Sequence, residues 1–162
     1  MTLAALTDAV QNHPAAVAIG EGPLFGIFEA FHMVGVAILF GSLFMVDLRL
    51  LGVAAHRYSV KALSDELTPW TWAGFGLAAV TGALMAAANL TYYVGNAAFQ
   101  LKLLLLLLAL ANMLIFHAVL WRGVGRWGEA GAPPLGARIA GGLSLALWIG
   151  VICAGRWIAF VH

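Results

Sequence analysis

The stretch that decides the fold is residues 24–50, LFGIFEAFHMVGVAILFGSLFMVDLRL. A helix of this length crosses the roughly 30 Å of bilayer hydrocarbon, because each helical residue adds about 1.5 Å. Its ionisable side chains are Glu29 and His32 near one end and Asp47 and Arg49 near the other. Ionisable groups in a membrane span are costly, so each is a candidate functional residue.

The composition of the whole chain excludes a soluble domain. Apolar residues make up 63% of the sequence and charged residues 9%, against about 25% charged in soluble domains. We therefore expect an integral membrane protein, embedded in a lipid bilayer. The net charge of +1 provides no basic surface for nucleic acid. A single cysteine, Cys153, and the absence of a C-x-x-C-H motif exclude an internal disulfide and a covalently attached haem.

The hydropathy pattern predicts an all-α, up-down-up-down bundle of four membrane-spanning helices. Residues 1–23 form an N-terminal interfacial segment, with a short amphipathic helix over residues 2–12, and residues 24–162 form the transmembrane domain. We expect the second span to begin with Thr68 as N-cap and Pro69 at the first helical position. The predicted spans are residues 24–50, 69–92, 97–121 and 138–161.

The basic residues predict the orientation of the bundle. Six of the eight lysines and arginines lie in the first and third connections or at the adjoining helix ends. The positive-inside rule therefore places these two connections in the cytoplasm and both termini in the periplasm. This distribution predicts a multi-pass protein of the bacterial plasma (inner) membrane. The exceptions, Lys102 and Arg156, lie within spans.

Three polar side chains from three spans are expected at one depth. With about 1.5 Å per residue from the span centres, His32, Lys102 and Arg156 lie about 8, 10 and 9 Å outward of the midplane. Glu29 lies slightly further out and would close the same pocket. This layer fits one non-covalent haem, with His32 as iron ligand, Lys102 as second ligand or charge partner, and Arg156 paired with a propionate.

The structural alternatives for these residues are simple. In the alternative interpretation, His32 only forms an interhelical hydrogen bond and Lys102 extends toward the membrane surface. His117 is retained as a cofactor-binding candidate, although it is equally explained as an interfacial residue or as a partner of Asp47. It lies about 20 Å from His32 along the membrane normal, so these two histidines do not ligate one iron.

Three segments resemble a known family: FHMVGVAILFGSLFMVDLRLL (31–51), TGALM (81–85) and FQLKLLLLLLALANMLIFH (99–117). Together they are similar to the HemJ-type protoporphyrinogen oxidases and the copper-resistance D (CopD) membrane domains, over roughly residues 28–120. The resemblance implies a b-type haem at His32 and Lys102. The chain differs from the HemJ-type pattern at Leu48, where the family has proline, and His117 lies about one turn further from the lysine.

These observations predict a membrane haem protein that transfers electrons to or from quinone or a partner redox protein. One alternative is a HemJ-type protoporphyrinogen IX oxidase, and another is a haem-free accessory or copper-handling subunit. Scattered methionines and one cysteine argue against copper transport. Small residues at every fourth position of the last span, residues 142–154, would suit close packing within a homo-oligomer or a larger membrane complex.

Overall fold

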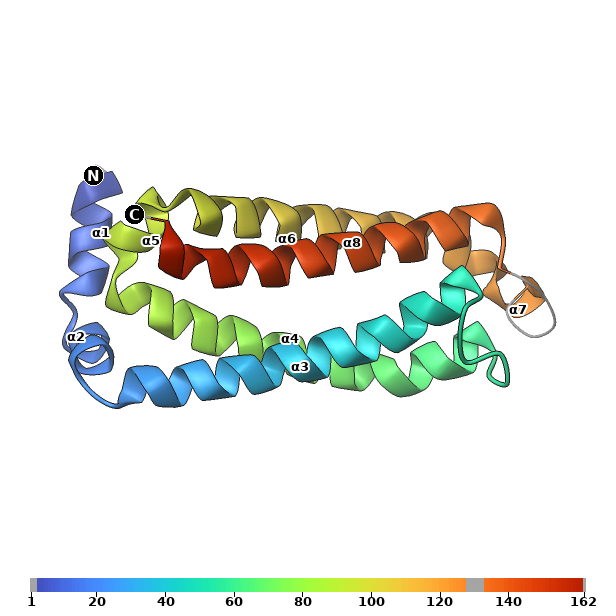
Figure 1. Ribbon diagram of the computed structural model, residues 1–162, viewed down its shortest axis with the longest axis horizontal. Coiled ribbons are helices and arrows are strands. Elements are labelled where there is room, and N and C mark those ends of the chain that lie inside the picture. Colours follow the sequence, from blue (N-terminus) through green and yellow to red (C-terminus); the bar gives the residue numbers. More distant parts are fainter. Residues whose placement is uncertain (1–2, 128–132, 162) are drawn as a thin grey trace.

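The computed structural model describes residues 3–127 and 133–161, and every regular element within these ranges is helical (Figure 1). Four helices are long and apolar enough to cross a membrane, which confirms the predicted all-α class. They are α3 (Leu24–Leu51), α4 (Val60–Ala88), α6 (Ala97–Ile115) with its continuation to Gly123, and α8 (Leu135–Trp157) with its continuation to Phe160.

Shorter helices lie at the two ends of the bundle. At one end α1 (Leu3–Gln11) and α2 (Pro14–Glu21) run across the ends of the long helices, beside α5 (Leu90–Gly95). At the other end, α6 continues as the π-helical turn η1 (Phe116–Leu120), the 3₁₀ turn η2 (Trp121–Gly123) and α7 (Val124–Trp127). A 3₁₀ turn, η3 (Ile158–Phe160), follows α8. Helix α1 confirms the predicted helix over residues 2–12, whereas α2 was not predicted.

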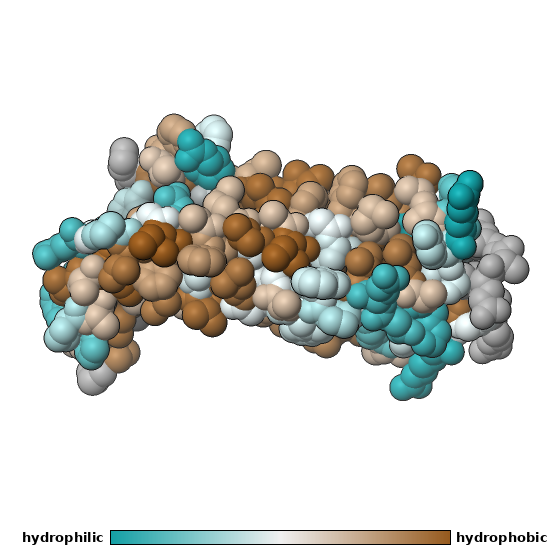
Figure 2. Space-filling model, turned by 90° about the horizontal axis from the view of Figure 1, so that it is seen from below, coloured by the Kyte–Doolittle hydropathy of each residue, from teal (hydrophilic) through white to brown (hydrophobic). Residues whose placement is uncertain are grey.

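The long helices alternate in direction and form two layers, α3 with α4 and α6 with α8 (Figure 1). The layers contact each other through α3 and α8, while α4 and α6 do not pack extensively in the described part of the chain. Helices α3 and α4 cross, so that α3 approaches α8 toward the α7 end and separates from it toward the α1 end (Figure 1). On the face built by α3 and α4, hydrophilic residues gather toward the ends and the middle is mainly apolar (Figure 2).

Glycines bring α3 and α4 into backbone contact. A Cβ atom added to Gly35 would lie 2.7 Å from the Ala78 nitrogen, and one added to Gly74 would lie 2.6 Å from the Leu39 nitrogen. No side chain fits between backbones this close, and small residues are common where membrane helices pack tightly. The Ser42 hydroxyl, which lies 2.8 Å from the Thr71 hydroxyl, joins the same two helices further along.

The layers are joined at the α7 end by a small apolar core. Its buried residues come from α3, α4, the end of α6 and α8: Leu50, Val60, Phe116, Val124 and Ala137. Helix α8 approaches α3 closely here, because a Cβ atom on Gly141 would lie 2.9 Å from the Leu50 Cβ. The α3–α8 contact therefore closes one end of the bundle.

The predicted start of the second span is wrong. Helix α4 begins nine residues earlier than residue 69, with Ser59 as N-cap accepting a hydrogen bond from the Ala62 amide at 3.0 Å. Pro69 lies inside the helix, and the Thr68 hydroxyl donates to the Ser64 carbonyl at 2.6 Å. The helix continues through Pro69 even though this residue has no amide hydrogen to donate to the Asp65 carbonyl one turn earlier. The third span does begin after Asn96, whose side chain caps α6.

The close contact at Gly74 predicts that alanine substitutions at two glycines of α4 differ in their effect on the stability of the folded protein. Gly74→Ala is expected to destabilise the folded protein by about 1–3 kcal/mol, because its methyl group would overlap the α3 backbone. Gly76→Ala is the matched control on the same helix, since nothing lies within 4 Å of its added Cβ. Thermal unfolding in detergent measures both. Equal midpoints for the two variants would contradict the backbone contact.

Candidate functional site

The His32 ring is oriented by a hydrogen bond to the neighbouring helix. Its Nδ1 atom lies 2.8 Å from the Ala78 carbonyl oxygen of α4. A carbonyl only accepts, so Nδ1 carries the hydrogen and donates it. The Thr81 hydroxyl lies 3.3 Å from the same nitrogen and donates its own hydrogen to the Leu77 carbonyl at 2.6 Å. In this tautomer Nε2 carries a free lone pair, the arrangement by which a backbone carbonyl commonly orients a metal-binding histidine.

Glycine makes room for this ring. A Cβ atom on Gly82 would lie 3.0 Å from the His32 Cε1 atom, so a larger residue would push against the imidazole. The TG pair of the TGALM segment therefore contacts the histidine directly, through Thr81 and Gly82. The interhelical hydrogen bond expected as the structural alternative for His32 is present, and among the described residues only the Nδ1 atom of the ring has a hydrogen-bond partner.

Lys102 approaches the same region from the other layer. Its side chain is half-buried and packs on α8, where a Cβ atom on Gly155 would lie 3.6 Å from the lysine Nζ atom. Lys102 and Glu29 are the charged side chains close enough to influence His32 electrostatically. Within the described ranges the only ion pair joins Lys61 to Asp65 at the opposite end of α4, so the Lys102 ammonium has no carboxylate in contact there.

Arg156 and His117 are not brought to His32. The Arg156 guanidinium lies over the Phe160 ring at 5.1 Å from its centroid, and both residues are exposed. The His117 Nδ1 atom donates to the Met113 carbonyl of its own helix at 2.9 Å, and the ring packs against Trp121. Of the residues predicted to share a layer, Lys102 and Glu29 are close enough to act electrostatically on His32, whereas the Arg156 guanidinium lies over the Phe160 ring.

The predicted pairing of Asp47 with His117 is not formed. Asp47 is buried, with 4% of its surface exposed, where α3 meets α8. Ser144 of α8 lies within hydrogen-bonding reach of the Asp47 carboxyl group. The Oδ2 atom of Asp47 has no hydrogen-bond partner among the described residues. Two residues further along, the Arg49 Nε atom donates to the Tyr58 carbonyl at 2.8 Å, which fixes the loop after α3.

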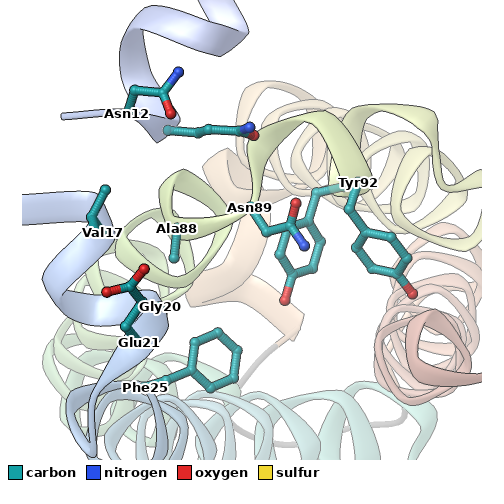
Figure 3. Close-up of a pocket in the computed structure, with 10 residues that line it drawn as sticks. Asn12, Val17, Gly20, Glu21, Phe25, Ala88, Asn89 and Tyr92 are labelled. Carbon is teal, nitrogen blue, oxygen red and sulfur yellow. The ribbon is translucent and has the colours of Figure 1, made fainter.

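A pocket that the sequence did not reveal lies at the α1 end of the bundle (Figure 3). It has a volume of about 550 Å³, within the usual range for small-molecule sites. Its lining residues come from α1, α2, the start of α3, the end of α4 and α5: Gln11, Asn12, Val17, Gly20, Glu21, Phe25, Ala88, Asn89, Tyr92 and Tyr93. These segments are far apart in sequence, so no local pattern marks the pocket.

The pocket adjoins the His32 region through Tyr93 and Glu29. Burial, followed by Tyr92 and Glu29, raises the pKa of the Tyr93 phenol, so this hydroxyl stays protonated. The same Glu29 carboxylate acts electrostatically on His32. Glu29 is therefore close enough to act electrostatically on both Tyr93 of the pocket and His32.

The residues around His32 fit a haem. His32 presents one free ring nitrogen, and Lys102 is a half-buried cation without a carboxylate partner among the described residues. No group of three His, Cys, Asp or Glu side chains gathers within the described ranges. One histidine is a poor site for a free ion, but it suffices for a metal that brings its own macrocycle. Among the described residues, α4 and α6 also lack extensive packing against each other.

These features define a four-helix protein whose helices suit a membrane and whose polar site is built around one oriented histidine. The chain belongs to a family of unknown function, DUF6644, which matches residues 17–161. The match covers the four long helices and includes His32 and Lys102. No curated protein and no solved structure matches the chain.

The hydrogen bond to Ala78 predicts the tautomer of His32. In haem-free protein with ¹⁵N-labelled histidine, His32 is expected to show a protonated Nδ1 and an unprotonated Nε2 in nitrogen NMR spectra at alkaline pH. The spectrum of His32→Gln assigns the signal by its disappearance. An Nε2–H tautomer at this residue would contradict the geometry and remove the free ligand nitrogen.

Proposed function

We propose that this protein is a b-type haem-binding protein of the bacterial plasma membrane that transfers electrons to or from quinone or a partner redox protein. The observation that carries the proposal is the His32 ring, whose Nδ1–H is bound to the Ala78 carbonyl while Nε2 is left for a ligand. A bound haem supplies one-electron redox chemistry, and the chain determines its position and surroundings.

Each of the four long helices would contribute to holding the haem. Helix α3 supplies His32, and α4 orients the ring through Ala78 and makes room for it at Gly82. Helix α6 supplies Lys102, and α8 supports the lysine stem at Gly155. Lys102 would ligate the iron only as the neutral amine, because an ammonium has no lone pair to donate, whereas its ammonium form would pair with a propionate.

The proposed orientation places the α1 end of the bundle in the periplasm. The described basic residues Arg49, Arg57, Lys61, Arg122 and Arg138 lie at or beyond the opposite helix ends, which supports a cytoplasmic location for that end. The haem would then lie in the outer half of the membrane, close to a periplasmic electron donor and to quinones in the bilayer.

Optical spectra of the purified protein test haem binding and the iron ligand. Protein expressed with excess haem precursor is expected to show a Soret band and sharp bands after dithionite reduction. His32→Ala is expected to reduce bound haem by about tenfold or more, because the iron loses its oriented ligand. His117→Ala is the matched control, since this exposed ring bonds only within its own helix. Stable, colourless wild-type protein would reject the proposal, and haem loss only in His117→Ala would reject the ligand assignment.

Removing the positive charge of Lys102 on α6 is expected to affect haem binding more than removing that of Arg156 on α8. Lys102→Met keeps the length and apolar character of the stem while removing the charge, and should lower haem retention or shift the spectrum. Arg156→Met should leave both nearly unchanged, because Arg156 lies over Phe160 and away from Lys102. Pyridine haemochrome content and the reduced spectrum measure the difference. Greater haem loss in Arg156→Met would show that the arginine, rather than the lysine, faces the group.

A further inference from the structure

The pocket at the α1 end has an acidic lining. Glu21 is the only charged residue among the ten that line it, and none of the ten is Lys, Arg or His. The other polar groups are the amides of Gln11, Asn12 and Asn89 and the two phenols. Glu29 adds a second carboxylate nearby, since it acts on Tyr93. A phosphate or carboxylate ligand would find negative charge here without a basic side chain to pair with.

Three helices end at this pocket. Helix α1 ends at Gln11, α2 at Glu21 and α4 at Ala88, and each of these residues lines the pocket. The last carbonyl groups of a helix point outward from its C-terminus and carry partial negative charge. Helix α2 packs on the end of α4, because a Cβ atom on Gly20 would lie 3.6 Å from the Ala88 carbonyl oxygen. The carbonyl ends thus add to the negative potential of the carboxylates.

Aromatic rings line the same space. Figure 3 shows Phe25 beside Glu21 on one side of the pocket and Tyr92 with Asn89 on another. Tyr92 and Tyr93 pack edge to face, with ring centroids 5.4 Å apart. The Tyr92 hydroxyl donates to the Ile158 carbonyl at 2.8 Å, which fixes its ring against the end of α8. Aromatic faces attract organic cations, and the attraction is stronger where a carboxylate is close.

We propose that this pocket binds an organic ammonium group, carried either by the headgroup of a zwitterionic lipid or by a free amine. The carboxylate of Glu21 and the carbonyl ends of α1, α2 and α4 supply the negative charge, and Phe25 and the tyrosines supply the apolar walls. The pocket lies at the ends of the long helices, at the level where lipid headgroups would surround a spanning bundle. The volume exceeds that of the ammonium group alone, so part of the attached molecule is held as well.

Matched soluble ligands test the charge requirement. Choline, ethanolamine and the neutral choline isostere 3,3-dimethylbutan-1-ol are titrated into the full-length protein in detergent, with binding followed by saturation-transfer NMR. At least one ammonium compound is expected to bind about tenfold or more tightly than the neutral isostere. Glu21→Gln should weaken that binding about three- to tenfold, and Phe25→Leu should weaken it as well. Asp8→Asn is the matched control, because Asp8 is an exposed acid of α1 outside the pocket lining.

Lipid retention identifies the source of the ammonium group. Protein in nanodiscs containing phosphatidylethanolamine and phosphatidylglycerol is analysed by native mass spectrometry, and the parent is compared with Glu21→Gln. If phosphatidylethanolamine is retained selectively and Glu21→Gln abolishes this retention, the site binds lipid. If free amines bind but phosphatidylethanolamine is not retained, the site binds a soluble amine. Equal binding of the neutral isostere, preference for the anionic lipid, or no effect of Glu21→Gln would overturn the proposal. His32→Ala should bind like the parent, which separates this site from haem binding.

Discussion

The close approach of α3 and α4 at Gly35 and Gly74 is the constraint on which the site depends. With added Cβ atoms predicted within 2.6–2.7 Å of the opposing backbone, the two helices are as near as their main chains allow. This approach brings the Ala78 carbonyl within 2.8 Å of the His32 ring, less than one turn of α3 from Gly35. The Ala78 carbonyl also accepts from Thr81 of its own helix at 3.4 Å, and the close approach of the helices lets it accept from the His32 ring of α3 as well. The glycine contact therefore selects the histidine tautomer.

The two ends of the bundle differ in how the layers meet. At the α7 end, Gly141 lets α8 reach Leu50 and Asp47 of α3, and the apolar core excludes water. Toward the α1 end α3 separates from α8 (Figure 1), and His32, Lys102 and Glu29 all belong to the halves of their helices nearer this end. The close contact between the layers therefore lies at the end opposite these polar side chains. Asp47 is the exception at the α7 end, where Ser144 is its hydrogen-bonding neighbour on α8.

The sequence predicted the helices better than their contacts. Hydropathy was sufficient to locate the four long helices, because a run of about 20 apolar residues has few other stable forms. It failed at the start of α4, where Pro69 suggested a helix start although Ser59 and Thr68 let the helix continue through it. Depth along the membrane normal grouped His32 with Lys102, which acts on it electrostatically, but depth does not determine the direction of a side chain around its helix. Arg156 and the Asp47–His117 pair show this limit, as does the pocket assembled from five separate segments.

A site shared by both layers links ligand binding to the stability of the bundle. His32 and its hydrogen-bond partner belong to the α3–α4 layer, while Lys102 and Gly155 belong to the α6–α8 layer. The layers have direct packing mainly through α3 and α8, so a group held between His32 and Lys102 would add contacts where the protein alone has few. Any ligand that binds only the folded arrangement stabilises it in proportion to the logarithm of its concentration relative to its dissociation constant. Lys102 would make a second contribution to this stabilisation. Its half-buried ammonium has no carboxylate partner among the described residues, which costs free energy in the protein alone. A bound electron-rich group would offset that cost.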